Sequence, residues 1–138
     1  MTTISGISGS YQNLQLLIFG VTLDVSTIIR VAANGGNDAD ASGLEETTAY
    51  STTSQALRLN QTGFTTGGFN SWVLDIYNYT STTAYKPFAL SGRYYAGGQK
   101  ATSASGGYVT TSAITSIDIV VAGSNNATGG TCLIYGVK

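Results

Sequence analysis

The residues between 71 and 95 show the clearest alternation of apolar and polar positions in the chain. Trp72, Leu74 and Ile76 alternate with a second set of residues that includes an acid. A period of two is typical of a strand with one face inward, so we place the Trp72 side in the core. Polar residues at 78–83 have the length of a hairpin turn, and aromatic and apolar residues resume at 85–95. The pattern predicts two long strands folded back on each other.

Apolar or alternating runs elsewhere predict six further strands, whereas residues 34–43 and 97–107 are rich in Gly, Ser and Asp or Thr and are predicted to be loops. About eight strands joined by turn-rich connections predict an all-β fold, an antiparallel β-sandwich. We divide the chain into an N-terminal arm, 1–10, and a single sandwich domain, 11–138. The six further strands are expected at 11–21, 27–33, 50–59, 108–110, 114–122 and 131–137.

Pro87 lies near the start of the second strand of the predicted hairpin. Because proline cannot donate to a ladder, it places this start at a sheet edge or just before pairing begins. Monomeric β proteins protect their edges with lysine and inward charge, but this chain has only Lys86, Lys100 and Lys138. We therefore expect other copies of the chain to cover its edges and low-charge faces.

Charge is the unusual quantity in the composition. Charged residues make up 9% of the chain, against about 25% in an ordinary soluble domain. Six basic residues and a net charge of -1 cannot form a basic face, so we expect no nucleic acid partner. The first ten residues lack a basic segment, and the longest apolar run, 14–19, is too short to span a bilayer. We therefore expect no signal peptide, no membrane anchor and no membrane partner.

The chain contains no histidine, which excludes a Ser-His-Asp or Cys-His arrangement and any metal site that uses histidine. A glycosidase needs two acids about 5 to 10 Å apart across a cleft. Asp75 and Asp118 lie on strand faces opposite apolar residues, as solvent-facing charges do, and the seven acids form no catalytic pattern. We predict that the chain is not an enzyme and has no catalytic residues and no cofactor. Cys132, flanked by apolar residues, is predicted to be a buried thiol in a strand.

Asp38 and Asp40, followed by Ser42 and Gly43, partly match a calcium-binding loop. The match fails at its twelfth position, where Ala49 stands in place of the bidentate glutamate. A solvated turn is therefore the default interpretation, and a calcium site of another type remains an alternative.

Five tyrosines cluster around the predicted hairpin and are the remaining functional candidates. A tyrosine combines a large apolar face with a polar tip, so it can anchor a protein interface or stack on a sugar ring. Cross-strand packing or subunit contact is favoured over carbohydrate recognition. The five are Tyr77, Tyr79, Tyr85, Tyr94 and Tyr95.

The same segments resemble a widespread group of tailed-bacteriophage virion proteins. The resemblance covers essentially the whole chain and implies a jelly-roll-like sandwich, commonly trimeric, used as a capsid decoration or as the outer domain of tail and head fibres. It implies neither an enzyme nor a cofactor. The segments that carry it are YQNLQLLI at 11–18, IRVAANGGNDAD at 29–40, SWVLDIYNYTSTTAYKPFALSGRY at 71–94 and AITSIDIVVAGSNNATGGTCLIYGVK at 113–138.

Only the ten-residue arm precedes the first predicted strand, so we expect a decoration or cement protein without a fibre shaft. It would bind the assembled shell as a homo-oligomer, a trimer by the resemblance, and stabilise that shell. Its partners would be copies of itself and the major capsid protein or another virion protein, and its location the virion, assembled in the host cytoplasm. We expect shell contacts from residues 2–8, 34–43 and 97–107. The alternative is a head or tail fibre domain that binds host surface carbohydrate.

Overall fold

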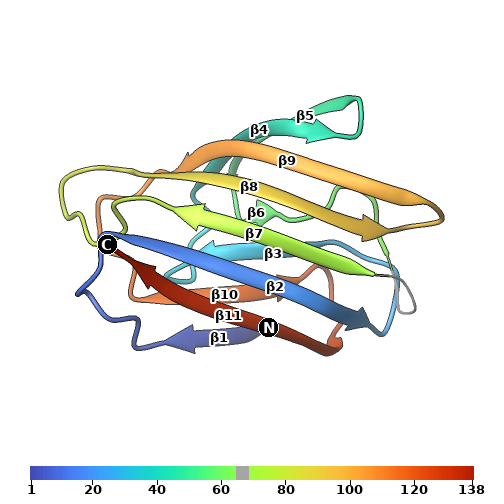
Figure 1. Ribbon diagram of the computed structural model, residues 1–138, viewed down its shortest axis with the longest axis horizontal. Coiled ribbons are helices and arrows are strands. Elements are labelled where there is room, and N and C mark those ends of the chain that lie inside the picture. Colours follow the sequence, from blue (N-terminus) through green and yellow to red (C-terminus); the bar gives the residue numbers. More distant parts are fainter. Residues whose placement is uncertain (65–68) are drawn as a thin grey trace.

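The computed structural model describes residues 1–64 and 69–138, and this part of the chain forms eleven β-strands in two antiparallel sheets (Figure 1). The sheets pack face to face, which confirms the predicted all-β sandwich. Within these ranges there is no helix, and so none able to cross a membrane. The small sheet has the order β1 (Thr2–Ser5), β10 (Ser116–Val121), β3 (Ile29–Ala33), β6 (Leu57–Arg58). The large sheet has the order β11 (Ala127–Val137), β2 (Asn13–Leu23), β7 (Asn70–Ile76), β8 (Lys86–Tyr95), β9 (Gln99–Tyr108), β4 (Ala39–Glu45), β5 (Thr48–Gln55).

Consecutive strands cross between the two sheets at most connections. When β7, β8 and β11 are set aside, the remaining orders are β1-β10-β3-β6 and β2-β9-β4-β5. This is the connectivity of an eight-stranded jelly roll. The β7–β8 hairpin is inserted between β2 and β9, and β11 extends the large sheet beyond β2.

The predicted hairpin of 71–95 is present as β7 and β8, paired in register from Asn70 and Tyr94 to Ile76 and Phe88. Trp72 is 1% exposed and lies opposite Gly92 in the pairing. A side chain at Gly92 would place its Cβ 2.0 Å from the Trp72 ring, so only glycine leaves room for the indole. The hairpin therefore supplies the centre of the core, as the alternation predicted.

Both segments predicted as loops contain strands. Residues 39–45 form β4 and residues 99–108 form β9, and the two pair along seven residues. Gly106 explains the error, because a Cβ there would lie 1.9 Å from the carbonyl oxygen of Asp40. A segment rich in small residues usually indicates a loop. In this chain the small residues instead allow the backbones of two strands to approach each other closely. Residues 50–59, predicted as one strand, divide between β5 and β6 in different sheets.

Part of the predicted N-terminal arm is a strand of the small sheet. Residues 2–5 form β1, which pairs with β10 from Thr2 and Ile119 to Ser5 and Ser116. The Thr3 hydroxyl donates a hydrogen bond of 2.5 Å to Asp118. Asp118 is buried, so the prediction that it faces solvent is wrong. Removing residues 2–8 would therefore uncover the edge of β10 as well as an acid.

Pro87 does not mark a sheet edge, because β8 lies inside the large sheet between β7 and β9. Its carbonyl oxygen accepts a hydrogen bond of 2.8 Å from the Tyr77 amide, one residue beyond the end of β7 at Ile76. Proline therefore lacks an amide hydrogen at the very end of the β7–β8 pairing, where few hydrogen bonds between the strands are lost. The edges of the large sheet are β11 and β5.

Candidate interaction surfaces

The structure separates the five candidate tyrosines. Tyr79 and Tyr94 are fully buried and belong to the core, whereas the other three are exposed. The exposed tyrosines lie at opposite ends of the β7–β8 hairpin. Tyr77 and Tyr85 flank its turn, and Tyr95 ends β8.

Tyr94 belongs to a polar network with a buried acid, Glu45, that no sequence pattern indicated. Its hydroxyl donates a hydrogen bond to Glu45, which also accepts bonds from the Gln61 amide at 2.7 Å and the Thr62 hydroxyl at 2.5 Å. Burial alone would raise the pKa of Glu45, but the hydrogen bonds from Thr62, Tyr94 and Gln61 together lower it below its ordinary value. Glu45 therefore fixes residues 61–62 against β4 and β8 as a hydrogen-bonded carboxylate.

Two further buried polar side chains have structural partners. Lys86 donates to the carbonyl oxygens of Ala84 at 2.7 Å and Thr110 at 2.9 Å, and burial lowers the pKa of its amine. The Tyr108 hydroxyl donates to the Val31 carbonyl oxygen at 3.2 Å and so connects the two sheets. Burial, and secondarily Asp38, raises the pKa of Tyr108 well above its ordinary range.

The calcium hypothesis finds little support in the geometry of residues 38–40. Asp40 accepts a hydrogen bond of 2.8 Å from the Ser54 amide across the β4–β5 pairing. In the ranges that the structure describes, no group of three acidic, Cys or His residues could hold a metal ion. Among the described residues, Asp38 and Asp40 therefore have no third acidic ligand beside them.

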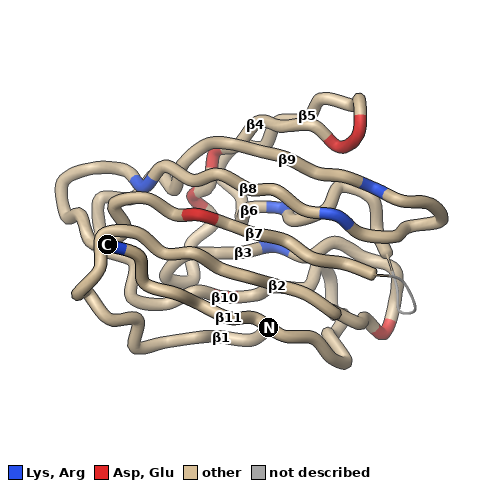
Figure 2. Tube along the Cα trace, in the orientation of Figure 1, with Lys and Arg blue, Asp and Glu red and all other residues tan. Residues whose placement is uncertain are grey.

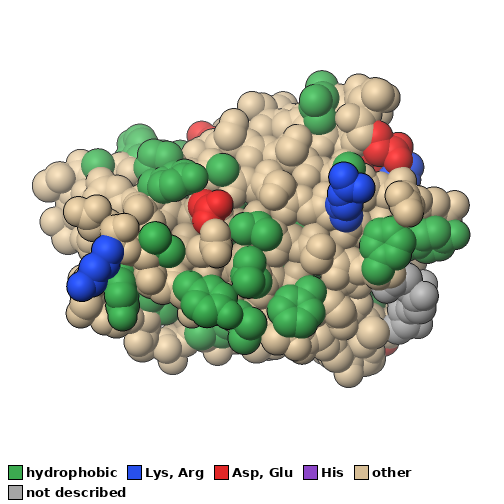
Figure 3. All heavy atoms as spheres, viewed as in Figure 1, with side chains coloured by type: hydrophobic (Ala, Val, Ile, Leu, Met, Phe, Trp, Pro, Cys, Tyr) green, Lys and Arg blue, Asp and Glu red, His purple; other side chains and the backbone are tan. Residues whose placement is uncertain are grey.

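One surface of the molecule is apolar over three adjoining strands. Leu133, Leu17 and Val73 lie abreast across β11, β2 and β7 and all point away from the core. Phe19, Tyr135 and Val137 extend this row and are each about two-fifths to one-half exposed. We call these six residues the apolar face. Figure 3 shows exposed apolar side chains gathered on this face of the molecule, with an acidic side chain among them.

Charge is almost absent from the same strands. β11 and β2 contain no charged residue, and β7 contains Asp75 alone (Figure 2). Asp75 accepts a hydrogen bond of 2.9 Å from Gln15 on the neighbouring strand. Contiguous apolar surface with little charge is typical of protein interaction sites.

The apolar face ends at an unprotected strand edge. β11 pairs with β2 on one side and with no other described strand. It is eleven residues long, without proline or charge, and its register with β2 is regular from Thr131 to Val137. Such an edge offers unpaired backbone groups to another strand.

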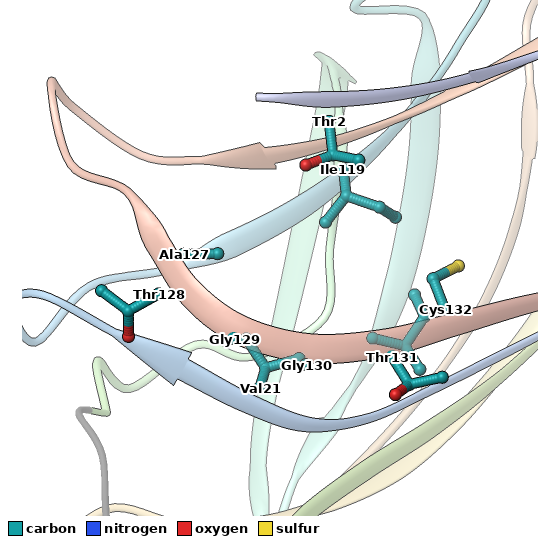
Figure 4. Close-up of a pocket in the computed structure, with 10 residues that line it drawn as sticks. Thr2, Val21, Ile119, Ala127, Thr128, Gly129, Gly130, Thr131 and Cys132 are labelled. Carbon is teal, nitrogen blue, oxygen red and sulfur yellow. The ribbon is translucent and has the colours of Figure 1, made fainter.

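A hollow separates this edge from the small sheet. A cavity of about 290 Å³ lies between β11, β2 and β1, lined by residues that include Ile18, Val21 and Ile119 (Figure 4). Cys132 lines it from β11 and is half-buried, and burial raises the pKa of its thiol. The thiol therefore stays protonated and behaves as a small apolar side chain.

A second candidate surface lies at the opposite end of the β8 strand from Tyr85. Phe69 and Tyr95 are 52% and 47% exposed, and their ring centroids lie 6.3 Å apart in an edge arrangement. Beside them, two shallow depressions of about 210 and 270 Å³ share Glu46 and Lys100, and the first also includes Arg93. Of these residues only Tyr95 was singled out from the sequence, because the others come together from separate strands.

Comparisons with known protein families, with curated proteins and with solved structures gave no match.

Proposed function

We propose that this chain is a structural protein of a tailed-bacteriophage particle that self-associates, as a trimer, and binds the assembled shell as a decoration protein. The apolar face with its open β11 edge is the observation that carries the proposal. The resemblance of the strand segments to phage virion proteins supports the location, a virion assembled in the host cytoplasm. In this role the chain contributes adhesion and no turnover.

The physical properties of the apolar face support the proposed self-association. Leu17, Val73 and Leu133 are adjacent, so a partner that covers one of them removes all three from water. A second copy of the chain is the proposed occupant, because the single charge on this side of β7, Asp75, is hydrogen-bonded to Gln15, so two copies meet with little like-charge repulsion. Around a threefold axis each copy presents this region to its neighbours, which closes the ring and covers the β11 edges.

The shell contact needs a surface other than the one used between copies. Three segments are expected to make it: 2–8 contains β1, 34–43 contains the start of β4, and 97–107 lies mostly in β9. The turn end of the β7–β8 hairpin is available, because Tyr77 is 43% and Tyr85 is 58% exposed. We propose that these two tyrosines meet the capsid protein, as rigid aromatic side chains often do at interfaces. Binding restricted to the assembled shell would then stabilise it by mass action.

Co-sedimentation with purified capsid shells tests the proposed shell binding. The wild-type chain should pellet with shells, and the double variant Tyr77→Ser, Tyr85→Ser should remain in the supernatant with its self-association unchanged. A matched control is Tyr95→Ser, which alters a tyrosine that is 47% exposed at the opposite end of β8. Failure of the wild-type chain to bind any shell would contradict the decoration role but not self-association.

A second candidate function is that of a fibre domain that binds host carbohydrate. The exposed pair of Phe69 and Tyr95 favours it, because an exposed aromatic face can stack on a sugar ring. A glycan array distinguishes this function from shell decoration, since a decoration protein alone would bind no glycan.

A further inference from the structure

The groove beside Phe69 and Tyr95 has a composition different from that of the apolar face. Its aromatic pair is bordered by charged and amide side chains: Glu46, Arg93, Gln99 and Lys100 line the first depression together with Phe69. In Figure 3 exposed apolar side chains lie next to basic and acidic ones at this end of β8 and β9. An aromatic surface surrounded by hydrogen-bonding groups suits a ligand that is itself both apolar and polar.

Phe69 and Tyr95 are not required for the core. They lie one residue beyond the paired residues Asn70 and Tyr94, on the outer side of the large sheet, while Tyr94 points inward and contacts Trp72 at a ring-centroid distance of 5.9 Å. Their mutual edge contact leaves about half of each side chain exposed. Two large rings held by strand ends are therefore available to a ligand, and little side-chain entropy is lost when the ligand binds.

The charges around these rings do not cancel. Glu46 is paired with Lys100 at 3.1 Å, and Glu45 points into its hydrogen-bonded network with Thr62 and Tyr94. Arg93 is exposed and, among the residues described, has no carboxylate within ion-pair distance. It lies opposite Ala101 in the pairing of β8 with β9, and the Ala101 carbonyl accepts a bond of 2.8 Å from the Glu46 amide. The guanidinium is thus the unpaired charge of the groove.

We propose that this groove binds a saccharide that carries a carboxylate, with a sugar ring on Tyr95 and Phe69 and the carboxylate on Arg93. The inference rests on the second candidate function, carbohydrate binding, and adds its site and the class of sugar. Tyrosine and phenylalanine rings offer a flat apolar surface to the C–H face of a sugar. Arginine presents donors in a planar fork that matches a carboxylate. Gln99 and the Glu46–Lys100 pair provide further groups for the sugar hydroxyls.

A protein partner fits this groove less well than it fits the apolar face. Three charged residues, Glu46, Arg93 and Lys100, line the first depression, whereas protein interfaces are depleted in charge at their centre. This depression, of about 210 Å³, is smaller than a typical enclosed ligand pocket. It therefore suits one or two rings of a longer chain.

An array of defined oligosaccharides tests the proposal on the wild-type chain. The probes are tetragalacturonic acid and sialyl-lactose, with fully methyl-esterified tetragalacturonate and lactose as their respective neutral counterparts. We expect at least one acidic probe to bind about tenfold or more tightly than its neutral counterpart. Arg93→Gln should abolish this preference, and Tyr95→Ser should weaken acidic and neutral probes alike.

Two controls keep the result interpretable. Tyr85→Ser removes an exposed tyrosine from the other end of β8 and should bind as the wild type does. Circular dichroism of each variant should match the wild type, since Arg93, Tyr95 and Tyr85 are all exposed.

The outcomes separate the inference from the function on which it rests. Binding of a neutral probe as tight as that of its acidic counterpart overturns the carboxylate assignment and leaves carbohydrate binding in place. Binding that Arg93→Gln and Tyr95→Ser do not change overturns this groove as the site. No binding of any probe overturns both the inference and carbohydrate binding by this chain.

Discussion

The two edges of the large sheet present opposite surfaces. The β11 edge is eleven residues long and uncharged. Its pairing with β2 shifts register twice before Thr131 and is regular from there to Val137, where it borders the apolar face. The β5 edge has the sequence TAYSTTSQ, is mostly hydroxyl-bearing, and pairs with β4 through a register shift between Ala39 and Ala41. Ser54 in this strand has a φ of 52°, which interrupts its extended course.

This difference leaves the β5 edge protected and the regular part of the β11 edge open. Irregular pairing and polar side chains discourage the addition of another strand at β5. Neither device is present at the regular part of β11. The small sheet protects its own edges by length, since β1 has four residues and β6 has two.

The largest effect on self-association is expected from placing a charge on β11. Leu133→Asp should weaken self-association by about a thousandfold, because each copy would bring an unpaired carboxylate into an apolar contact. The matched variant Ser51→Asp places the same charge on β5, where the exposed side chain meets solvent, and should leave association unchanged. Sedimentation velocity over a concentration series measures both. Equal effects from the two variants would contradict the distinction between the edges.

A second prediction concerns how the β4–β5 end is held without a partner. Glu45→Ala should lower the free energy of unfolding by about 2 to 3 kcal/mol, because the Gln61 and Thr62 amides and the Tyr94 hydroxyl lose a charged acceptor. Self-association of the folded protein should not change. Urea denaturation of the variant beside Tyr94→Phe, which removes one donor and should cost about 1 kcal/mol, tests the size of the network.

The same carboxylate makes a pH prediction. The pKa of Glu45 is lower in the folded protein than its ordinary value of 4.5. Its contribution to stability is therefore complete above that value and is lost as the pH falls through the lowered pKa. The melting temperature should fall below about pH 4.5 in the wild type and fall less in Glu45→Gln. An identical acid-induced decrease in both proteins would show that another group is responsible.

The smallest effect is expected at the border of the apolar face. Phe19 lies on β2 opposite Thr131 and is 41% exposed, so it covers the contact without forming its centre. Phe19→Ser should weaken self-association by about tenfold and leave thermal stability of the monomer unchanged within error. An effect as large as that of Leu133→Asp would move the centre of the contact from β11 to β2.

Alternation along the chain predicted the part of the fold that depends on apolar burial. Trp72, Leu74 and Ile76 point inward as their period of two required, and the same parity, carried from Leu90, places Tyr94 inside and Tyr95 outside. Tyr94 and Tyr95 were nevertheless treated as equivalent candidates from the sequence. Applying the strand period to β8 would have separated them.

The rest of the fold depends on contacts that composition does not reveal. β4 and β9 pair because Gly106 allows the backbones to approach, and Gly, Ser and Thr in a row indicate a loop in most chains. β1 is short and exposed, and it is specified by β10, which lies more than a hundred residues away in sequence. Glu45 and Arg93 acquire their surroundings only through strand pairing, so no local motif marks them.

Sedimentation equilibrium of the purified chain tests the central claim most directly. The account predicts a species of three times the chain mass of 14.2 kDa at micromolar concentration, converted to single chains by Leu133→Asp. A wild-type protein that remains at 14.2 kDa over the whole concentration range would contradict it.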